Sequence, residues 1–261
     1  MRIFKRITAG IKPICDTSRN RHKSWIDLIR KDQEINEGCA INSYKYFVGH
    51  KAPDFPLWPG FSFFENEKDV AQRGPYIENV NDDSVISEYF SLFNLKRKLR
   101  EADAGPNDLI TICQHRRFVL NVKSGAPAKN LPARVIAQDT IKHLSFGPEL
   151  FPREGQNYLI GSTMKLKEGM MHQYARCHHI RDLLRFCSDL VDAELLTDDE
   201  AEEFLNQKSL MPAPSCGTFE LHLFFEIMDF LETATEVFLS SGYKSYEDIY
   251  QFRVVAFLLE R

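Results

Sequence analysis

The stretch Leu109-Ile-Thr-Ile-Cys-Gln-His-Arg-Arg-Phe118 joins a short apolar run directly to a dense polar group. The run from Leu109 is typical of a strand buried in a parallel sheet. The polar residues would then lie just beyond the carboxyl end of that strand, where open α/β sheets bind their ligands. His115, Arg116 and Arg117 are a candidate receiver for phosphate or carboxylate, which guanidinium groups bind by two hydrogen bonds. This stretch alone leaves open a solvated basic turn after a strand.

The residues before this strand predict a strand and a helix. A β-rich run covers residues 44–49 and leads into a proline-rich loop. Apolar residues recur at helical spacing over residues 84–99, with Ser87 or Asp83 as the candidate N-cap. The order strand, helix, strand favours a βαβ unit with parallel strands.

The second half of the chain has a mainly helical pattern. Residues 121–160 are rich in glycine and proline and are expected to form loops around an open site. The pattern is helical over residues 169–207, where Thr197 and Glu200 form a capping box. A long amphipathic helix is expected over residues 218–239, and a last apolar stretch covers residues 245–261.

Length and composition set broad limits on the class of protein. A chain of 261 residues with 43% hydrophobic content can bury a sizeable core. Its longest apolar runs are too short to cross a bilayer, and its first residues lack the pattern of a secretory signal. The six cysteines form no C-x-x-C pair. We therefore expect reduced thiols and a cytoplasmic location, with the inner face of the membrane as the other place to consider.

The charge of the chain is divided unevenly. Residues 1–31 hold nine Lys or Arg against two Asp, a balance of +7 that leaves −11 for the rest of a chain with net charge −4. We interpret residues 1–43 as a basic, mostly helical extension. Its first turns fit either a helix on anionic lipid, giving peripheral membrane contact through residues 1–31, or a helix packed on its own domain. The acidic body argues against nucleic-acid binding.

Four pieces of the sequence resemble, in order, the motifs of a known family. The run Tyr44 to Lys51 resembles the opening strand of a bacterial family of capsular and exopolysaccharide glycosyltransferases, formerly a domain of unknown function. Ile86-Ser-Glu88-Tyr resembles a helix start of that family, and Ile112 to Phe118 resembles its signature LCHYRRY. Arg253 to Arg261 resembles its closing RV-x-GF-LSER. The similarity covers roughly residues 44–261.

The resemblance implies one GT-A-like domain over residues 44–261. Such a domain is an α/β fold, related to the Rossmann fold, with a mixed but mostly parallel sheet flanked by helices. The implied function is transfer of a sugar from a nucleotide-sugar donor to a glycan or lipid-linked acceptor in surface polysaccharide synthesis. The nucleotide would bind the N-terminal half, and the acceptor would meet the C-terminal half.

The sequence departs from the usual chemistry of such enzymes. The strand from Leu109 has no Asp-x-Asp motif after it, although a diphosphate leaving group needs its charge neutralised by Mg²⁺, Mn²⁺ or cationic side chains. We therefore expect Arg116 and Arg117, with His115 and Lys51, to replace the metal. A nucleoside-diphosphate sugar with Mg²⁺ or Mn²⁺ stays open as the alternative. The His-Tyr of the family signature is Gln114-His115 here, which weakens any role carried over from the family histidine.

Specific residues are candidates for the site. The expected substrate-binding residues are His50, Lys51, Glu88, Arg116, Arg117, Arg253 and Glu260. An inverting transferase also needs a carboxylate base near the acceptor hydroxyl. Glu220 and Glu226, beside aromatic residues, are the candidates for that base, and His115 is a third candidate catalytic residue. No metal site is expected at Cys177, His178 and His179 with His172, because zinc usually needs four ligands at set spacings and adjacent histidines on a helix point about 100° apart.

Two other classes of function remain open. A catalytically silent binding or scaffold protein on the same fold is consistent with the missing Asp-x-Asp motif. A nucleotidyl- or phosphotransferase is the weaker alternative, because the chain has neither a phosphate-binding Gly-x-x-x-x-Gly-Lys loop nor an acidic metal cluster.

Overall fold

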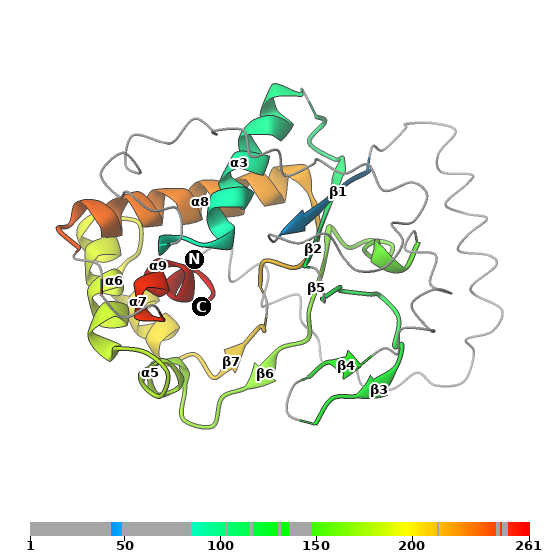
Figure 1. Cartoon of the computed structure of the whole chain (residues 1–261). Coiled ribbons are helices and arrows are strands. Elements are labelled where there is room, and N and C mark those ends of the chain that lie inside the picture. The colour runs from blue at the N-terminus through cyan, green and yellow to red at the C-terminus, as the bar shows by residue number, and fades with distance from the viewer. Residues whose placement is uncertain are drawn as a thin grey trace.

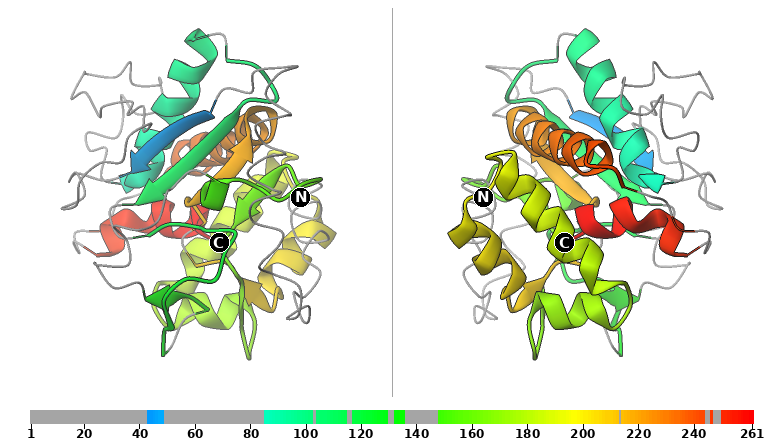
Figure 2. Two further views of the ribbon diagram at one scale, coloured as in Figure 1. Left: turned by 90° about the vertical axis from the view of Figure 1, so that its right-hand side faces the viewer. Right: turned by 90° about the vertical axis from the view of Figure 1, so that its left-hand side faces the viewer.

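A four-stranded sheet with helices packed on one face forms the centre of the computed structural model (Figures 1 and 2). The structure describes residues 43–48, 85–102, 104–114, 117–129, 132–135, 148–212, 214–243, 246 and 250–261. The predicted extension at residues 1–43 lies almost entirely outside these ranges. Among the described helices, none is both long enough and apolar enough to span a bilayer.

The predicted βαβ unit is present. Strand β1 (Ser43–Val48) pairs in parallel with β2 (Leu109–Gln114), and helix α3 (Glu88–Glu101) lies between them in the chain. The four central residues of β2 are buried, as expected for a strand covered on both faces. Helix α3 begins later than residue 84, and its buried side chains include Tyr89, Leu92 and Leu99.

The described sheet is mixed, not mostly parallel. Its order is β1-β2-β8-β5, and β8 (Gly217–Glu220) runs antiparallel to both β2 and β5 (Tyr158–Ile160). One of the three pairings is therefore parallel. Backbone pairing with β2 and β5 makes β8 a strand where a helix was expected. Buried Thr218 adds a side-chain contact, because its Oγ1 lies 2.9 Å from Oγ1 of Thr111 on β2. Helix α8 (Leu221–Ser240) consequently starts three residues later than predicted.

The remaining elements are short. Two small antiparallel sheets join β3 (Ala126–Pro127) to β4 (Arg134–Val135) and β6 (Met164–Lys165) to β7 (Ser209–Leu210). The other elements are the 3-10 helices η2 (Pro148–Leu150) and η3 (Gln251–Arg253) and the helices α5 (Met170–Ala175), α6 (Ile180–Asp192), α7 (Asp198–Leu205) and α9 (Val254–Leu259). The capping box of α7 is confirmed: Glu200 N donates to Thr197 Oγ1 at 3.2 Å, and Thr197 N donates to Glu200 Oε2 at 3.1 Å.

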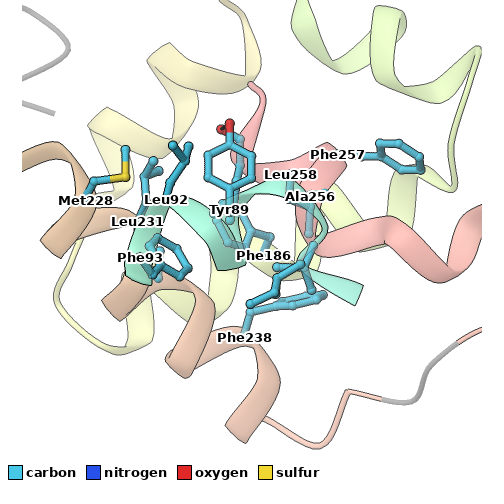
Figure 3. Packing of buried hydrophobic residues seen from close by; sticks show 14 of the residues in the cluster. Tyr89, Leu92, Phe93, Phe186, Met228, Leu231, Phe238, Ala256, Phe257 and Leu258 are labelled. Carbon is cyan, nitrogen blue, oxygen red and sulfur yellow. Dashed lines mark hydrogen bonds between the residues drawn. The ribbon is translucent and has the colours of Figure 1, made fainter. Parts of the chain in front are cut away.

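The core lies between the sheet and four helices. Side chains of α3, α6, α8 and α9 meet in one cluster (Figure 3). All six residues of α9 are buried, as expected for a helix that is apolar on every side. The hydroxyl of Tyr89 on α3 donates to the carbonyl oxygen of Leu259 at 3.0 Å, which fixes α9 against the start of α3. The end of the chain is thereby held beside the end of β2.

Candidate active site

Several elements begin or end at the same edge of the sheet. Val48 and Gln114, the last residues of β1 and β2, are register partners there. Helix α3 begins at this edge, because the crossover helix of a βαβ unit runs back along its strands. Strand β8 runs the other way, so the segment before it, with Ser215, reaches the same edge. Open α/β sheets bind ligands beyond the carboxyl ends of their parallel strands. We call this place the carboxyl edge.

Glu88 is held at the carboxyl edge by both of its carboxylate oxygens. Gln114 Nε2 donates to Oε2 at 2.9 Å, and Ser215 Oγ donates to Oε1 at 2.6 Å. Glu88 also begins α3, where a negative charge interacts favourably with the positive end of the helix dipole. Residues from three separate parts of the chain therefore fix the position of this carboxylate.

Arg117 lies on a tight turn that follows β2. The backbone groups of Gln114 and Arg117 exchange two hydrogen bonds, at 3.0 and 3.1 Å. Arg117 Nη1 also donates to Gln114 Oε1 at 3.3 Å, so Gln114 connects Arg117 to Glu88. The Arg117 side chain is exposed and can meet a ligand. His115 and Arg116, the two residues inside the turn, lie outside the described residues.

Arg253 reaches the same edge from the C-terminal end of the chain. Its Nη2 donates to Ser87 Oγ at 2.8 Å. Its Nε is buried and finds no acceptor among the described residues. Ser87 itself has φ 50° and ψ −127°, a backbone conformation that L residues rarely adopt. Its side chain does not cap α3, as a helix-starting serine would, but holds Arg253. Strain of this kind gathers at functional sites.

Glu260 and Arg261 complete this group of charges. Burial raises the pKa of the Glu260 carboxyl, and the negative charge of Glu88 raises it further. Arg261, Arg253 and Arg117 lower the pKa of Glu260 in turn, so all of these charges act on one another. Arg261 Nη1 lies 3.8 Å from Glu260 Oε2, and only 8% of the Arg261 side chain is exposed.

Five side chains thus converge at the carboxyl edge. We call them the carboxyl-edge cluster: Glu88, Gln114, Arg117, Arg253 and Glu260. Four of the five were expected to bind substrate. Gln114 was noticed only as a departure from the family signature, although it makes the central contacts.

Three supporting residues were missed. Ser215 lies in the loop before β8, and its approach to Glu88 depends on a strand that the helical pattern concealed. Ser87 was one of two candidate N-caps of α3, and its contact with Arg253 had no local signal. Arg261 follows Glu260 directly, and its place in the closing motif Arg253 to Arg261 was the available clue.

The two expected carboxylate bases do not join the cluster. Glu220 is the register partner of Leu109, the first residue of β2, whereas the cluster gathers at the last. At about 3.3 Å per residue the two ends of this six-residue strand lie roughly 16 Å apart. Glu220 there lies 3.3 Å from Nδ1 of His222. Glu226 is exposed on α8, which begins at that opposite edge.

Other expected residues fall outside the cluster or outside the structure. His50 and Lys51 lie outside the described residues, two and three positions beyond Val48 in the sequence. His178 is buried and stacks on Phe257, and His179 lies against the ring of Tyr246. Within the described ranges, no group of three or more His, Cys, Asp or Glu side chains is arranged to hold a metal ion.

Comparison with known proteins finds a solved structure with a similar fold. No family model matches the sequence, and no curated protein matches it. Among solved structures, the fold is similar to that of WbbM, a bifunctional glycosyltransferase, in its apo form. The TM-score is 0.59 at 12% sequence identity, and the match covers 84% of this chain. The chain spans 41% of WbbM, so the likeness is to a part of that protein. The chain therefore has a glycosyltransferase-like fold.

Proposed function

We propose that this protein is a glycosyltransferase that takes a sugar from a nucleotide-sugar donor and transfers it to a glycan or lipid-linked acceptor. The observation that carries the proposal is the carboxyl-edge cluster, where residues from α3, β2 and the last turn of the chain meet. The fold likeness to part of a glycosyltransferase supports the same class of reaction.

The cations of the site suit the diphosphate of the donor. Arg117 is exposed, Arg253 has a buried Nε without an acceptor among the described residues, and Arg261 has a second such atom. Guanidinium groups bind phosphate oxygens by paired hydrogen bonds. In a partly buried site they also stabilise the negative charge that develops on a leaving diphosphate. His50, Lys51, His115 and Arg116 remain proposed additions to this set.

Glu260 is the carboxylate best suited to take the proton of the acceptor. In the transfer, the acceptor oxygen forms a bond to the anomeric carbon, the bond from that carbon to the phosphate oxygen breaks, and the diphosphate leaves with the electron pair. The acceptor hydroxyl must lose its proton. The pKa of Glu260 is raised by burial, which makes this carboxylate a better base. Glu88 is less suited, because both of its oxygens already accept hydrogen bonds.

The described side chains of the cluster do not fit a Mg²⁺ or Mn²⁺ site. Such ions prefer several free oxygen ligands. Here the oxygens of Glu88 are occupied, and Glu260 lies among the positive charges of three arginines. We therefore propose charge neutralisation by arginine and derive no step through a metal ion. Peripheral membrane contact through residues 1–31, near the inner face of the membrane, also remains a proposal.

A donor-cleavage assay tests the proposed function. The full chain is incubated with a panel of uridine- and guanosine-diphosphate sugars and a mixture of methyl glycosides, with Mn²⁺ or with a chelator. We expect nucleoside diphosphate to be released from one donor, and the chelator to leave the rate unchanged. Binding of a nucleotide without release by any donor would favour a silent binding protein. If the chelator abolished the release of nucleoside diphosphate, this would contradict the proposal that arginines neutralise the diphosphate charge.

A further inference from the structure

The side chain of Gln114 lies between a carboxylate and a guanidinium. Its Nε2 donates to Glu88 Oε2 at 2.9 Å, and its Oε1 accepts from Arg117 Nη1 at 3.3 Å. Nε2 also donates at 3.3 Å to Oγ of Ser215, whose hydroxyl donates to the other oxygen of Glu88 at 2.6 Å. The bond to Glu88 is partly buried and the bond to Arg117 is exposed. The amide of Gln114 therefore connects the inside of the carboxyl-edge cluster to its surface.

The neighbours of Gln114 fix the direction in which its amide points. A carboxylate accepts hydrogen bonds without donating, and a guanidinium donates without accepting. The two hydrogens of the Gln114 NH2 group meet two acceptors, Glu88 and Ser215. The hydroxyl oxygen of Ser215 is able to accept because its own hydrogen goes to Glu88. A reversed amide would set an oxygen against the carboxylate and N–H donors against Arg117, so only one orientation satisfies every group.

This orientation holds the Arg117 side chain by an uncharged group. The turn after β2 fixes the backbone of Arg117 through two hydrogen bonds with Gln114, and the amide oxygen then holds Nη1. Among the described side chains, Gln114 is the one hydrogen-bond partner of Arg117. A guanidinium has several N–H donors in one plane, so a single contact at Nη1 leaves donors for the oxygens of a phosphate.

Gln114 also stands between the charges of Arg117 and Glu88. The two charged groups bond to opposite ends of the same neutral amide. A direct ion pair between them would compensate the positive charge by which Arg117 attracts a phosphate. A glutamate at position 114 would have the same size, but it would face Glu88 with like charge and pair with Arg117. The amide is thus suited to hold the guanidinium and leave its charge available.

We propose that Gln114 is a positioning residue, which aims the Arg117 guanidinium at the diphosphate of the donor and keeps it from pairing with Glu88. Glu88 and Ser215 act through Gln114, because they set the orientation of its amide. This gives Glu88, whose oxygens are both occupied, a part in the site that requires no contact with the donor. The inference rests on the proposed transferase function, in which Arg117 binds the donor diphosphate.

Calorimetric titration of the full chain with uridine and guanosine diphosphates, at neutral pH and with a chelator, tests this role. Gln114→Glu keeps the size of the side chain but adds a charge between Glu88 and Arg117. We expect this variant to bind the nucleotide that wild type binds about tenfold more weakly, the loss of a charge-assisted contact. Gln156→Glu makes the same change in an exposed loop before β5, at the opposite edge of the sheet, and should bind as wild type does.

The pH dependence of Gln114→Glu distinguishes positioning from a general loss of structure. A protonated glutamate has one donor and one acceptor, as the amide does. Because the added carboxyl would face Glu88, it should take up a proton as the pH falls, and the deficit relative to wild type should shrink towards about pH 5. Glu260, Arg253 and Cys216 are the other titratable groups close to this network. They are unchanged in the variant, so comparison with wild type at each pH removes their contribution.

Exchanging the two residues gives a second variant with the same groups in the opposite order. Glu88→Gln combined with Gln114→Glu keeps one amide and one carboxylate, but the charge now stands next to Arg117. The melting temperature should recover from that of Gln114→Glu towards that of wild type, whereas nucleotide binding should remain about tenfold weaker. If Gln114 only supported the fold, binding would recover together with stability.

The outcomes separate the role of Gln114 from the function it rests on. Unchanged nucleotide binding in Gln114→Glu, or binding restored by the exchange with Glu88, would overturn the positioning role and leave the proposed function standing. A deficit in Gln114→Glu that is equally large at neutral and acid pH would also overturn the positioning role alone. Failure of wild type to bind either nucleotide would overturn both.

Discussion

At the scale of single residues, Ser87 shows how the site departs from optimal folding. Its φ of 50° is unfavourable for a residue with a Cβ atom, and such a conformation costs of the order of 1–3 kcal/mol. Its hydroxyl holds Arg253 instead of capping α3. The backbone strain therefore supports the position of a cation of the carboxyl-edge cluster.

Two substitutions at Ser87 separate strain from the hydrogen bond. Ser87→Ala removes the hydroxyl but keeps the strain, whereas Ser87→Gly removes both. We expect the glycine variant to be more stable than the alanine variant by about 1 kcal/mol, measured by urea unfolding. Both variants should bind nucleotide more weakly than wild type. Equal stability of the two variants would show that the Ser87 conformation carries no strain.

Glu260 is predicted to oppose stability while serving function. The raised pKa means that the folded state binds this proton more tightly than the unfolded state. Stability therefore declines as pH rises from the ordinary pKa of a glutamate through the raised folded value. Glu260→Gln should raise the melting temperature at neutral pH, and the gain should vanish in acid. The same variant should slow transfer by about 100-fold or more. A gain that persists in acid, or unchanged transfer, would contradict this role.

The sequence revealed the charged residues of the cluster better than their partners. Glu88, Arg117, Arg253 and Glu260 belong to recognisable motifs, and the structure brings them together. The role of Ser215 depends on the pairing of β8 with β2, a contact between residues about 100 positions apart. The contact of Gln114 with Glu88 joins the end of β2 to the start of α3. No local pattern contains that information.

At the scale of elements, an ion network joins α3 to α8. Lys96 Nζ lies 2.8 Å from Asp229 Oδ1 and also contacts Glu232, although the Lys96 side chain is only 5% exposed. Arg100, nearer the end of α3, pairs with Asp229 at 2.6 Å but is 48% exposed. Lys96 occupies the buried stripe of α3, where its charge must be matched.

We expect the loss of these two contacts to lower the free energy of unfolding by very different amounts. Lys96→Ala removes a buried charge that pairs with two carboxylates and leaves the mostly buried Glu232 with Arg97 alone, so it should destabilise the protein by about 3 kcal/mol. Arg100→Ala removes an exposed pair and should cost less than about 1 kcal/mol. Denaturant unfolding of both variants measures the difference. Similar losses in the two variants would mean that burial of Lys96 does not govern the strength of this contact.

The elements also show where a sequence pattern is ambiguous. Residues 218–239 have the apolar spacing of one helix, and most of them form α8. The first three belong to β8 instead, because backbone pairing with β2 and β5 outweighs the local helical pattern. A four-residue buried strand has too few positions to show a period of its own. The mixed character of the sheet follows from this one strand.

At the scale of the whole molecule, the fold and the site support one account. The fold is similar to part of a bifunctional glycosyltransferase, and the likeness extends over 84% of the chain. The carboxyl-edge cluster lies where sheets of this kind bind ligands. The central claim is that arginines of this cluster bind the diphosphate of a nucleotide donor.

Calorimetric titration with uridine and guanosine diphosphates, in the presence of a chelator, tests that claim most directly. We predict that one nucleotide binds wild type and that Arg117→Ala or Arg253→Ala weakens its binding by about tenfold or more, the loss of a charge-assisted contact. Arg100→Ala, near the far end of α3, should bind as wild type does. Binding that is unchanged in both cluster variants, or no binding of either nucleotide, would contradict the account.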